Sequence, residues 1–209
     1  MAQAAFASLR LDPTRTVLLV VDVENEFCHP DGKCFIGDRG IAAVGRLSQL
    51  QARCRERGVP IVFVRSVRDP DDLEFTEFGR SPILLRNTWA TEYVPDVAPS
   101  PAEIVVEKHS HDPFNGTELE SRLRELGVSP GAQRTVLVTG VATNVCVACA
   151  IIGLSVRNYQ PVLVGDCAAS STAEQEELAY QLFSGAAYSH NVKLSTSDRI
   201  TFVTEPVLV

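Results

Sequence analysis

Three residues with reactive side chains each follow an apolar segment of the chain. Asp22 comes directly after a run of Val and Leu, Lys108 ends another apolar run, and Cys146 follows the turn that begins at Gly140. A carboxylate and an ammonium beside a thiol can activate the sulfur for attack on a carbonyl carbon, which is covalent catalysis. These residue types therefore predict a nucleophilic site, provided that the fold brings them together.

Each of the three also has a purely structural interpretation. Asp22 could cap a turn, because Asp side chains commonly bond nearby backbone groups. Lys108 could be a surface lysine whose aliphatic part lies along the fold. Cys146 could be a small buried apolar residue, which is the interpretation that we give to Cys149 and Cys167.

The setting of Cys146 favours chemistry over plain packing. Thr143 and Asn144 are both good N-cap residues, so a helix that begins near them would place Cys146 in its first turn. The free N–H groups and the dipole at a helix start favour a thiolate, and the same amides can hold an oxyanion. Cys146 is therefore the predicted nucleophile.

The elements that must position these residues alternate along the chain. Short runs rich in Val, Ile and Leu predict strands at 16–22, 60–65, 103–108, 135–140 and 161–166, with a weaker one at 192–195. The runs are continuous rather than alternating, so both faces of the sheet should be covered. Helical patterns lie between them at 39–57, 117–126, 144–158 and 173–187. Alternating strands and helices predict an α/β fold with a parallel sheet.

Ligands of an open parallel sheet gather beyond the carboxyl ends of the strands. The predicted strand ends place five features at that edge: Asp22, Arg65, Lys108, the turn from Gly140 to Cys146, and Asp166. The segment 66–101 interrupts the alternation and contains the only tryptophan, Trp89. A long segment without a clear period is typical of a lid or a subunit interface, and both remain open.

Composition limits the classes of function. A chain of 209 residues with 45% hydrophobic and 22% charged residues predicts one globular domain over 1–209. The net charge of −7 argues against nucleic acid as a partner, and no stretch is apolar enough for a membrane span. Without a leader-like start, the six cysteines are expected to be reduced, which predicts a cytoplasmic protein.

The motifs around the reactive residues resemble those of a known family. Asp22 in "VVDVENEF", Lys108 in "VVEKHSHDPFNGTEL" and Cys146 in "VTGVATNVCV" resemble, in order and spacing, the three motifs of the isochorismatase-like cysteine hydrolases. That family includes nicotinamidases, N-carbamoylsarcosine amidases, ureidoacrylate amidases and biuret hydrolases. The resemblance extends to "VLVGDCAAS" in the fifth predicted strand, and it implies a Rossmann-like, three-layer α/β/α sandwich with six parallel strands.

The resemblance also implies roles for individual residues. Asp22 would be the proton acceptor, Lys108 the charged group that stabilises the site, and Cys146 the nucleophile of this triad. A cis peptide would join Val141 to Ala142, and the amides of Ala142 and Cys146 would form the oxyanion hole. The thiolate would attack an amide-type carbonyl, the protonated acid would assist the leaving amine, and water activated by Asp22 would hydrolyse the thioester.

Departures from the family pattern narrow the predicted substrate. The stretch "FVRSVRDPDDLEF" lacks the histidine of the metal site in nicotinamidases, and the "HSH" of residues 109–111 is more typical of solvated loop residues. We therefore predict no metal and no cofactor. Because the nucleophilic cysteine is present, the resemblance favours a C–N bond over the vinyl ether that true isochorismatases cleave. "GVATNVCV" looks most like the ureidoacrylate-type amidases.

Four residues are candidates for contact with the substrate. Glu24 stands where the family usually has an amide, so it could contact a ureido or ammonium group, or it could be an exposed turn residue. The aromatic side chains of Phe27, Trp89 and Phe114 could line the pocket, or they could belong to the core or an interface.

The predicted function is cleavage of a small amide, carbamoyl or ureido compound by a homo-oligomer, a dimer or a tetramer. The alternatives are an isochorismatase-type or nicotinamidase-type hydrolase, or an inactive binding or scaffold protein of the same fold. A dinucleotide oxidoreductase is disfavoured, because no G-x-G-x-x-G follows the first strand.

Overall fold

The computed structural model of the protein describes residues 6–131 and 134–203. A six-stranded parallel sheet forms its centre, with the strand order β4-β3-β2-β5-β6-β7. These strands are β2 (Thr16–Val21), β3 (Ile61–Ser66), β4 (Ile104–Lys108), β5 (Thr135–Val141), β6 (Gln160–Ala169) and β7 (Lys193–Ser195). The prediction of a six-stranded parallel sheet is confirmed, and its order reverses between β2 and β5, where ligand sites of such sheets form.

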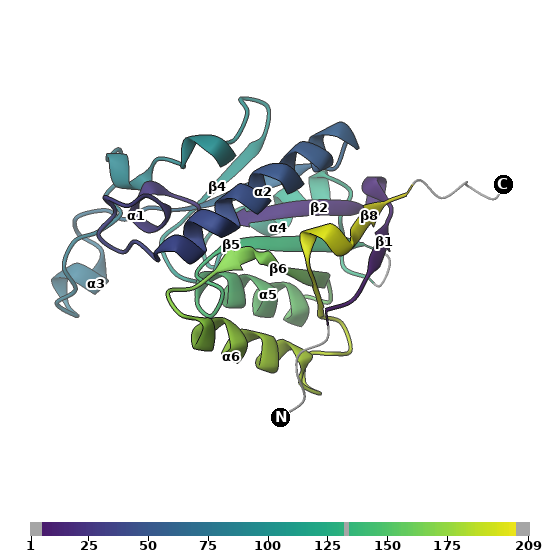
Figure 1. Ribbon diagram of the computed structural model, residues 1–209. Helices are drawn as coiled ribbons and strands as arrows, with labels where there is room; N and C mark the ends of the chain where they lie inside the picture. The colour runs from purple at the N-terminus through teal and green to yellow at the C-terminus, as the bar shows by residue number, and fades with distance from the viewer. Residues whose placement is uncertain (1–5, 132–133, 204–209) are drawn as a thin grey trace.

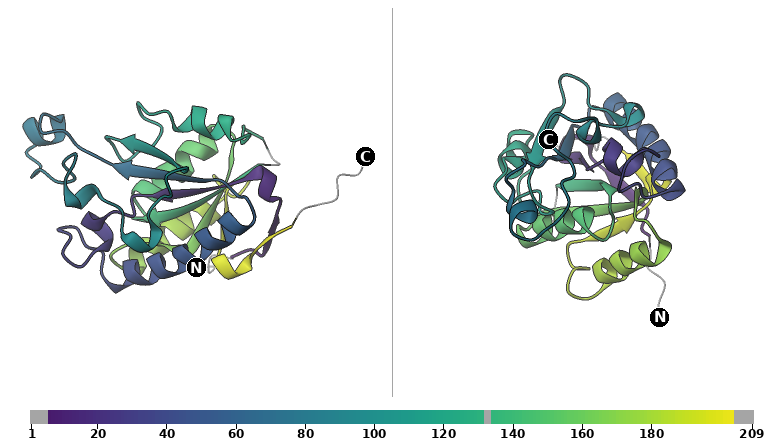
Figure 2. Two further views of the ribbon diagram at one scale, coloured as in Figure 1. Left: turned by 90° about the horizontal axis from the view of Figure 1, so that it is seen from above. Right: turned by 90° about the vertical axis from the view of Figure 1, so that its left-hand side faces the viewer.

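The central strand β2 divides its side chains between two cores. Val17, Leu19 and Val21 belong to one core, while Leu18 and Val20 belong to the other, because successive side chains of a strand point to opposite faces. The sheet is therefore the middle layer of three (Figures 1 and 2). The first face is covered by α4 (Leu119–Glu125), α5 (Cys146–Val156) and α6 (Ala173–Ser184), and the second by α2 (Asp38–Glu56).

The fifth predicted strand is longer than the sequence indicated. β6 continues past Asp166 to Ala169, and its register against β5 shifts, so that Gly140 pairs with Ala168. Asp166 therefore lies within the strand, where its carboxylate accepts hydrogen bonds of 2.6 Å from the N–H and the hydroxyl of Ser197. The expectation that Asp166 belongs to the carboxyl edge was wrong, because a bulged strand carries more residues than its apolar run suggests.

Several short elements were not predicted. A separate two-stranded parallel sheet pairs β1 (Leu9–Leu11) with β8 (Ile200–Phe202). The remaining helices are α1 (Asn25–Cys28), α3 (Leu73–Thr76) and the 3-10 turns Pro13–Arg15, Trp89–Thr91, Pro95–Val97 and Ser197–Arg199. Elements of three or four residues are too short to show a hydrophobic period. Within the described residues, no helix combines the length and apolar character that crossing a membrane requires.

The first part of the segment 66–101 extends beyond the carboxyl edge of the sheet, where α3 lies at the far end of the molecule (Figure 1), while Val97 near its end packs into the core on the α2 side. An isolated bridge between Glu24 and Tyr93 ties the segment to the rest of the fold, while a second bridge, between Arg68 and Leu85, lies within the segment itself. The N–H of Asn25 also donates to the carbonyl of Glu92 at 2.8 Å. This segment and α1 therefore lie together over the edge where β2 ends.

Candidate active site

Asp22 follows the last residue of β2 in a strained backbone conformation. Its φ is +53°, in the left-handed region that residues other than glycine seldom adopt, and its N–H donates to the carbonyl of Val64 at 2.9 Å. The side chain is completely buried. A buried carboxylate is costly unless a partner compensates it, so its neighbours determine what it can do.

Lys108 supplies that partner from two strands away. Its ammonium lies 2.9 Å from Asp22 Oδ2, and neither side chain has any exposed surface. The Nζ also donates to Ser66 Oγ at 2.7 Å and to the Ser110 carbonyl at 2.9 Å. The long lysine side chain therefore crosses the end of β3, where Ser66 holds it. Sequence reasoning did not single out Ser66, because one serine at a strand end carries no distinctive signal.

Cys146 is the first residue of α5, and its Sγ lies 3.4 Å from Lys108 Nζ. The three predicted catalytic residues therefore share one site. The expected helix cap was wrong, because Val145 stands at the N-cap and has no side-chain cap bond. Asn144 instead accepts a 2.8 Å hydrogen bond from Ser170 Oγ.

The turn before α5 is shaped by its backbone. The peptide bond between Val141 and Ala142 is cis, and the Ala142 carbonyl accepts hydrogen bonds from the N–H groups of Val145 at 3.0 Å and Val147 at 3.2 Å. Gly140 has a φ of +106°, and a Cβ at this position would lie 1.9 Å from the Val21 carbonyl oxygen. Only glycine fits there, because β2 and β5 approach each other so closely.

The resting sulfur is a thiol. Burial raises the pKa of Cys146, and the Asp22 carboxylate raises it further, while Lys108 opposes both. The sequence had suggested that a helix start would favour the thiolate, but the sulfur is too deeply buried for that effect to dominate. For Lys108, burial lowers the pKa, but the Asp22 carboxylate and the contact with Cys146 raise it overall, so the lysine stays charged. A thiol, a carboxylate and an ammonium in contact can exchange a proton when a carbonyl group arrives.

His111 is a further contact of the sulfur that sequence reasoning missed. Its Nδ1 lies 3.4 Å from Cys146 Sγ, although the residue as a whole is exposed. The available signal was the "HSH" stretch, which the sequence favoured as solvated loop residues. That interpretation suits His109 alone, because His111 reaches the reactive centre.

This chain is similar in sequence and in fold to known proteins. A sequence profile described as the isochorismatase domain matches residues 16–195 of the chain. The chain belongs to the isochorismatase family of hydrolases. The resemblance that the three motifs indicated is thereby confirmed.

Curated relatives of this isochorismatase-family chain are amidohydrolases by name. The ureidoacrylate amidohydrolase RutB of a Methylorubrum extorquens strain is 29% identical over 181 residues, which cover 76% of this chain and 71% of the relative. The protein of the same name from Pseudomonas syringae pv. syringae is 26% identical over 162 residues, or 66% of this chain and 64% of the relative.

Solved structures of the family share the fold. An isochorismatase-like hydrolase from Alkaliphilus metalliredigens superposes with a TM-score of 0.78 at 26% identity, covering 88% of this chain and 96% of the other. An N-carbamoylsarcosine amidase from Thermoplasma acidophilum gives a TM-score of 0.73 at 26% identity, with 88% and 97% covered. The three-layer arrangement predicted for this isochorismatase-family chain is therefore confirmed.

Glu24 of this isochorismatase-family chain is completely buried, so the exposed-turn interpretation was wrong. Its Oε1 accepts a 2.6 Å hydrogen bond from the N–H of Ser66, the same residue whose hydroxyl holds Lys108. Burial raises the pKa of Glu24 well above its usual value, and the charge of Asp22 adds to this, while the Ser66 N–H and Lys108 act in the opposite direction. The raised pKa favours the protonated form of Glu24, and Glu24 supports the lysine through Ser66.

The three candidate aromatic residues have separate surroundings. Phe114 is buried beside Gly153, and the Arg157 guanidinium lies 4.3 Å from its ring centre. Phe27 is half-buried and packs against the core on the α2 side of the sheet. Trp89 is 44% exposed and lines a cleft of about 350 Å³ with Glu26 and apolar side chains from 82–90. Roles for these three residues in substrate binding stay predictions.

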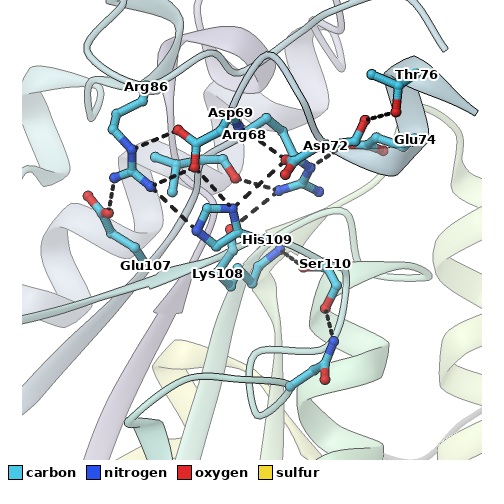
Figure 3. A network of polar contacts seen from close by, with 12 residues as sticks. Arg68, Asp69, Asp72, Glu74, Thr76, Arg86, Glu107, Lys108, His109 and Ser110 are labelled. Atoms are coloured by element: carbon cyan, nitrogen blue, oxygen red, sulfur yellow. Dashed lines mark hydrogen bonds and ion pairs between the residues drawn. The ribbon is translucent and has the colours of Figure 1, made fainter.

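A charged network fastens the segment 66–101 to the end of β4 (Figure 3). Arg86 pairs with Asp69 at 3.0 Å and with Glu107, the residue before Lys108. Arg68 is buried, pairs with Glu74, and donates to the Lys108 carbonyl at 3.3 Å. In Figure 3, His109 lies between these arginine side chains, and Lys108 turns away from it toward Ser110.

Arg65, which was expected at the carboxyl edge, lies within β3 near its end and joins the same charged network by pairing with Glu107. In the part of the chain that the structure describes, no group of three or more His, Cys, Asp or Glu side chains is arranged to hold a metal ion. The predicted absence of a metal or cofactor stays a prediction.

Proposed function

We propose that this protein is a cysteine-dependent amidohydrolase that cleaves the C–N bond of a small amide, carbamoyl or ureido compound through a thioester. The supporting observation is the contact of Lys108 Nζ with both Asp22 Oδ2, at 2.9 Å, and Cys146 Sγ, at 3.4 Å. The names of the amidohydrolase and amidase relatives agree with this chemistry.

The reaction would begin with transfer of the Cys146 proton to Asp22. The sulfur forms a bond to the substrate carbonyl carbon, and the amides of Ala142 and Cys146 hold the resulting oxyanion. The C–N bond then breaks, and the leaving nitrogen takes the proton from Asp22. Lys108 keeps its charge throughout. It compensates the negative charge of the sulfur when Cys146 is a thiolate, and the negative charge of Asp22 when the carboxylate is ionised.

Ammonia or amine release over a panel of ureido acids, carbamoyl amino acids, biuret and aromatic amides tests this function. We expect Cys146→Ala to lower turnover about 10⁴- to 10⁶-fold, because the nucleophile is lost. Cys149→Ala is the matched control, since Cys149 lies on the same helix and is only half-buried. An intact Cys146 thiol with no turnover of any compound would instead favour a binding or scaffold protein.

We also propose that the protein acts in the cytoplasm as a homo-oligomer. The six cysteines are free, which suits a reducing compartment. Three exposed apolar side chains lie in the segment 66–101, where Leu73 is 66% exposed, Phe78 82% and Trp89 44%. Apolar surface of this kind favours contact with a second subunit. Light scattering on the purified protein tests the assembly, and a monomer mass would refute it.

A further inference from the structure

The sulfur of Cys146 contacts one buried cation and one exposed ring. Lys108 Nζ and His111 Nδ1 both lie 3.4 Å from Sγ. Lys108 and Asp22 have no exposed surface, whereas His111 is exposed. His111 is thus a titratable group that contacts the reactive sulfur and is also exposed to solvent. It has no role in the reaction steps proposed for Asp22, Lys108 and Cys146.

His111 is electrically neutral in the resting site. Partial burial lowers its pKa, and the positive charges of Lys108, Arg68 and Arg80 lower it further, while Asp22 acts weakly in the other direction. A neutral imidazole has one nitrogen lone pair free to accept a proton. The ring can therefore serve as a base at neutral pH.

Hydrolysis of a thioester on Cys146 needs a base near the acyl carbon. That carbon is bonded to Sγ, so a group within hydrogen-bond distance of the sulfur is also close to a water molecule that attacks the acyl carbon. Asp22 is fully buried and paired with Lys108. His111 reaches both the sulfur and the surface from which water must come, so it is better placed than Asp22 for this step.

We propose that His111 is the general base for the second half of the reaction, a role that rests on the proposed cysteine mechanism. A water molecule gives one proton to Nδ1 of His111 while its oxygen forms a bond to the acyl carbon. The C–S bond then breaks, and its electron pair returns to the sulfur. The imidazolium passes the proton to the sulfur at 3.4 Å, which restores the thiol and the neutral ring and leaves a free acid product.

The test measures formation and decay of an acyl-enzyme separately. With p-nitrophenyl acetate as the probe, release of p-nitrophenol reports acetylation, and mass spectrometry follows the acetyl group on Cys146. We expect His111→Gln to acetylate at close to the wild-type rate, while decay of the acetyl-enzyme slows about 10²- to 10⁴-fold, as expected for loss of a general base. Added hydroxylamine should restore decay, because it attacks the thioester without needing a base.

His109→Gln is the matched control. His109 lies two residues away and pairs with Asp69 and Asp72 in the charged network, so its substitution should leave the decay of the acetyl-enzyme unchanged. In His111→Ala, added imidazole should enter the vacated exposed position and speed decay, whereas it should have little effect in His109→Gln. A protein that only needs His111 for folding would show no such rescue, and circular dichroism of each variant reports folding directly.

Two outcomes separate the two proposals. If Cys146 of the wild-type protein is never acetylated and no amide is turned over, both the cysteine mechanism and the role of His111 are wrong. If acetylation depends on Cys146 but the acetyl-enzyme of His111→Gln decays as fast as that of the wild type, only the role of His111 is overturned. Equal slowing of formation and decay would also overturn it.

Discussion

Lys108 Nζ lies 2.9 Å from Asp22 Oδ2 in a pair with no exposed surface. Removing one member of a buried ion pair leaves the other charge uncompensated, at a cost of about 3–5 kcal/mol. We expect Asp22→Asn and Lys108→Met each to lower the free energy of unfolding by about this amount, and the double variant to lose much less than the sum. Urea denaturation of the four proteins measures this coupling, and strictly additive losses would contradict it.

The same carboxylate should control the reactivity of the resting thiol. Burial and the charge of Asp22 raise the pKa of Cys146, while Lys108 lowers it. Asp22→Asn should therefore increase the thiolate fraction and speed alkylation of Cys146 by iodoacetamide, even though turnover is lost, and Lys108→Met should slow alkylation. Mass spectrometry of the Cys146 peptide gives the rates, with exposed Cys34 as the internal reference. Equal rates in both variants would refute this account.

The raised pKa of Glu24 has a consequence for stability. Because its pKa is raised above the usual value of 4.5, the folded protein keeps a proton that the unfolded chain has released. This contribution is lost as the pH rises from that value toward the raised folded pKa, with a slope of about 1.4 kcal/mol per pH unit. Glu24→Gln is neutral at every pH and can still accept the hydrogen bond from Ser66. We expect it to be increasingly more stable than the wild type as the pH rises.

Urea unfolding at about pH 5 and about pH 7 measures the free energy of unfolding of the wild type and of Glu24→Gln. The two proteins differ only in the carboxyl group of residue 24, so a change in the difference between them reports the titration of that group. Glu103→Gln is a control of opposite sign, because burial raises the pKa of Glu103 but its hydrogen bonds from Arg55 and Ser100 lower it overall. A constant difference between Glu24→Gln and the wild type would show that Glu24 is ionised in the fold.

Gly140 should tolerate no side chain. A Cβ there would lie 1.9 Å from the Val21 carbonyl oxygen, and its φ of +106° is unfavourable for other residues. We expect Gly140→Ala to prevent folding or to lower the melting temperature strongly. Gly45→Ala is the matched control, because Gly45 lies on the exposed side of α2 with open space around its Cα, so alanine should stabilise that helix by about 0.5–1 kcal/mol. Thermal unfolding followed by circular dichroism measures both.

The hydrophobic pattern by itself determined the sheet and its carboxyl edge. The runs at 16–22 and 103–108 end in Asp22 and Lys108, and a parallel sheet must place such ends at one edge. The turn from Gly140 to Cys146 was predictable for the same reason. The fifth run was misleading, because a bulge lengthens β6 beyond Asp166 and no apolar period marks a bulge.

Contacts between distant segments were decided only by the tertiary structure. Ser66 is separated from Lys108 by 42 residues and His111 from Cys146 by 35, so no local pattern could pair them. The charge states of Glu24 and Cys146 depend on how far water is excluded from them, and exclusion is a property of the packed layers. The sequence thus determines which reactive groups lie at the edge of the sheet. The packing determines their protonation states and which further side chains surround them.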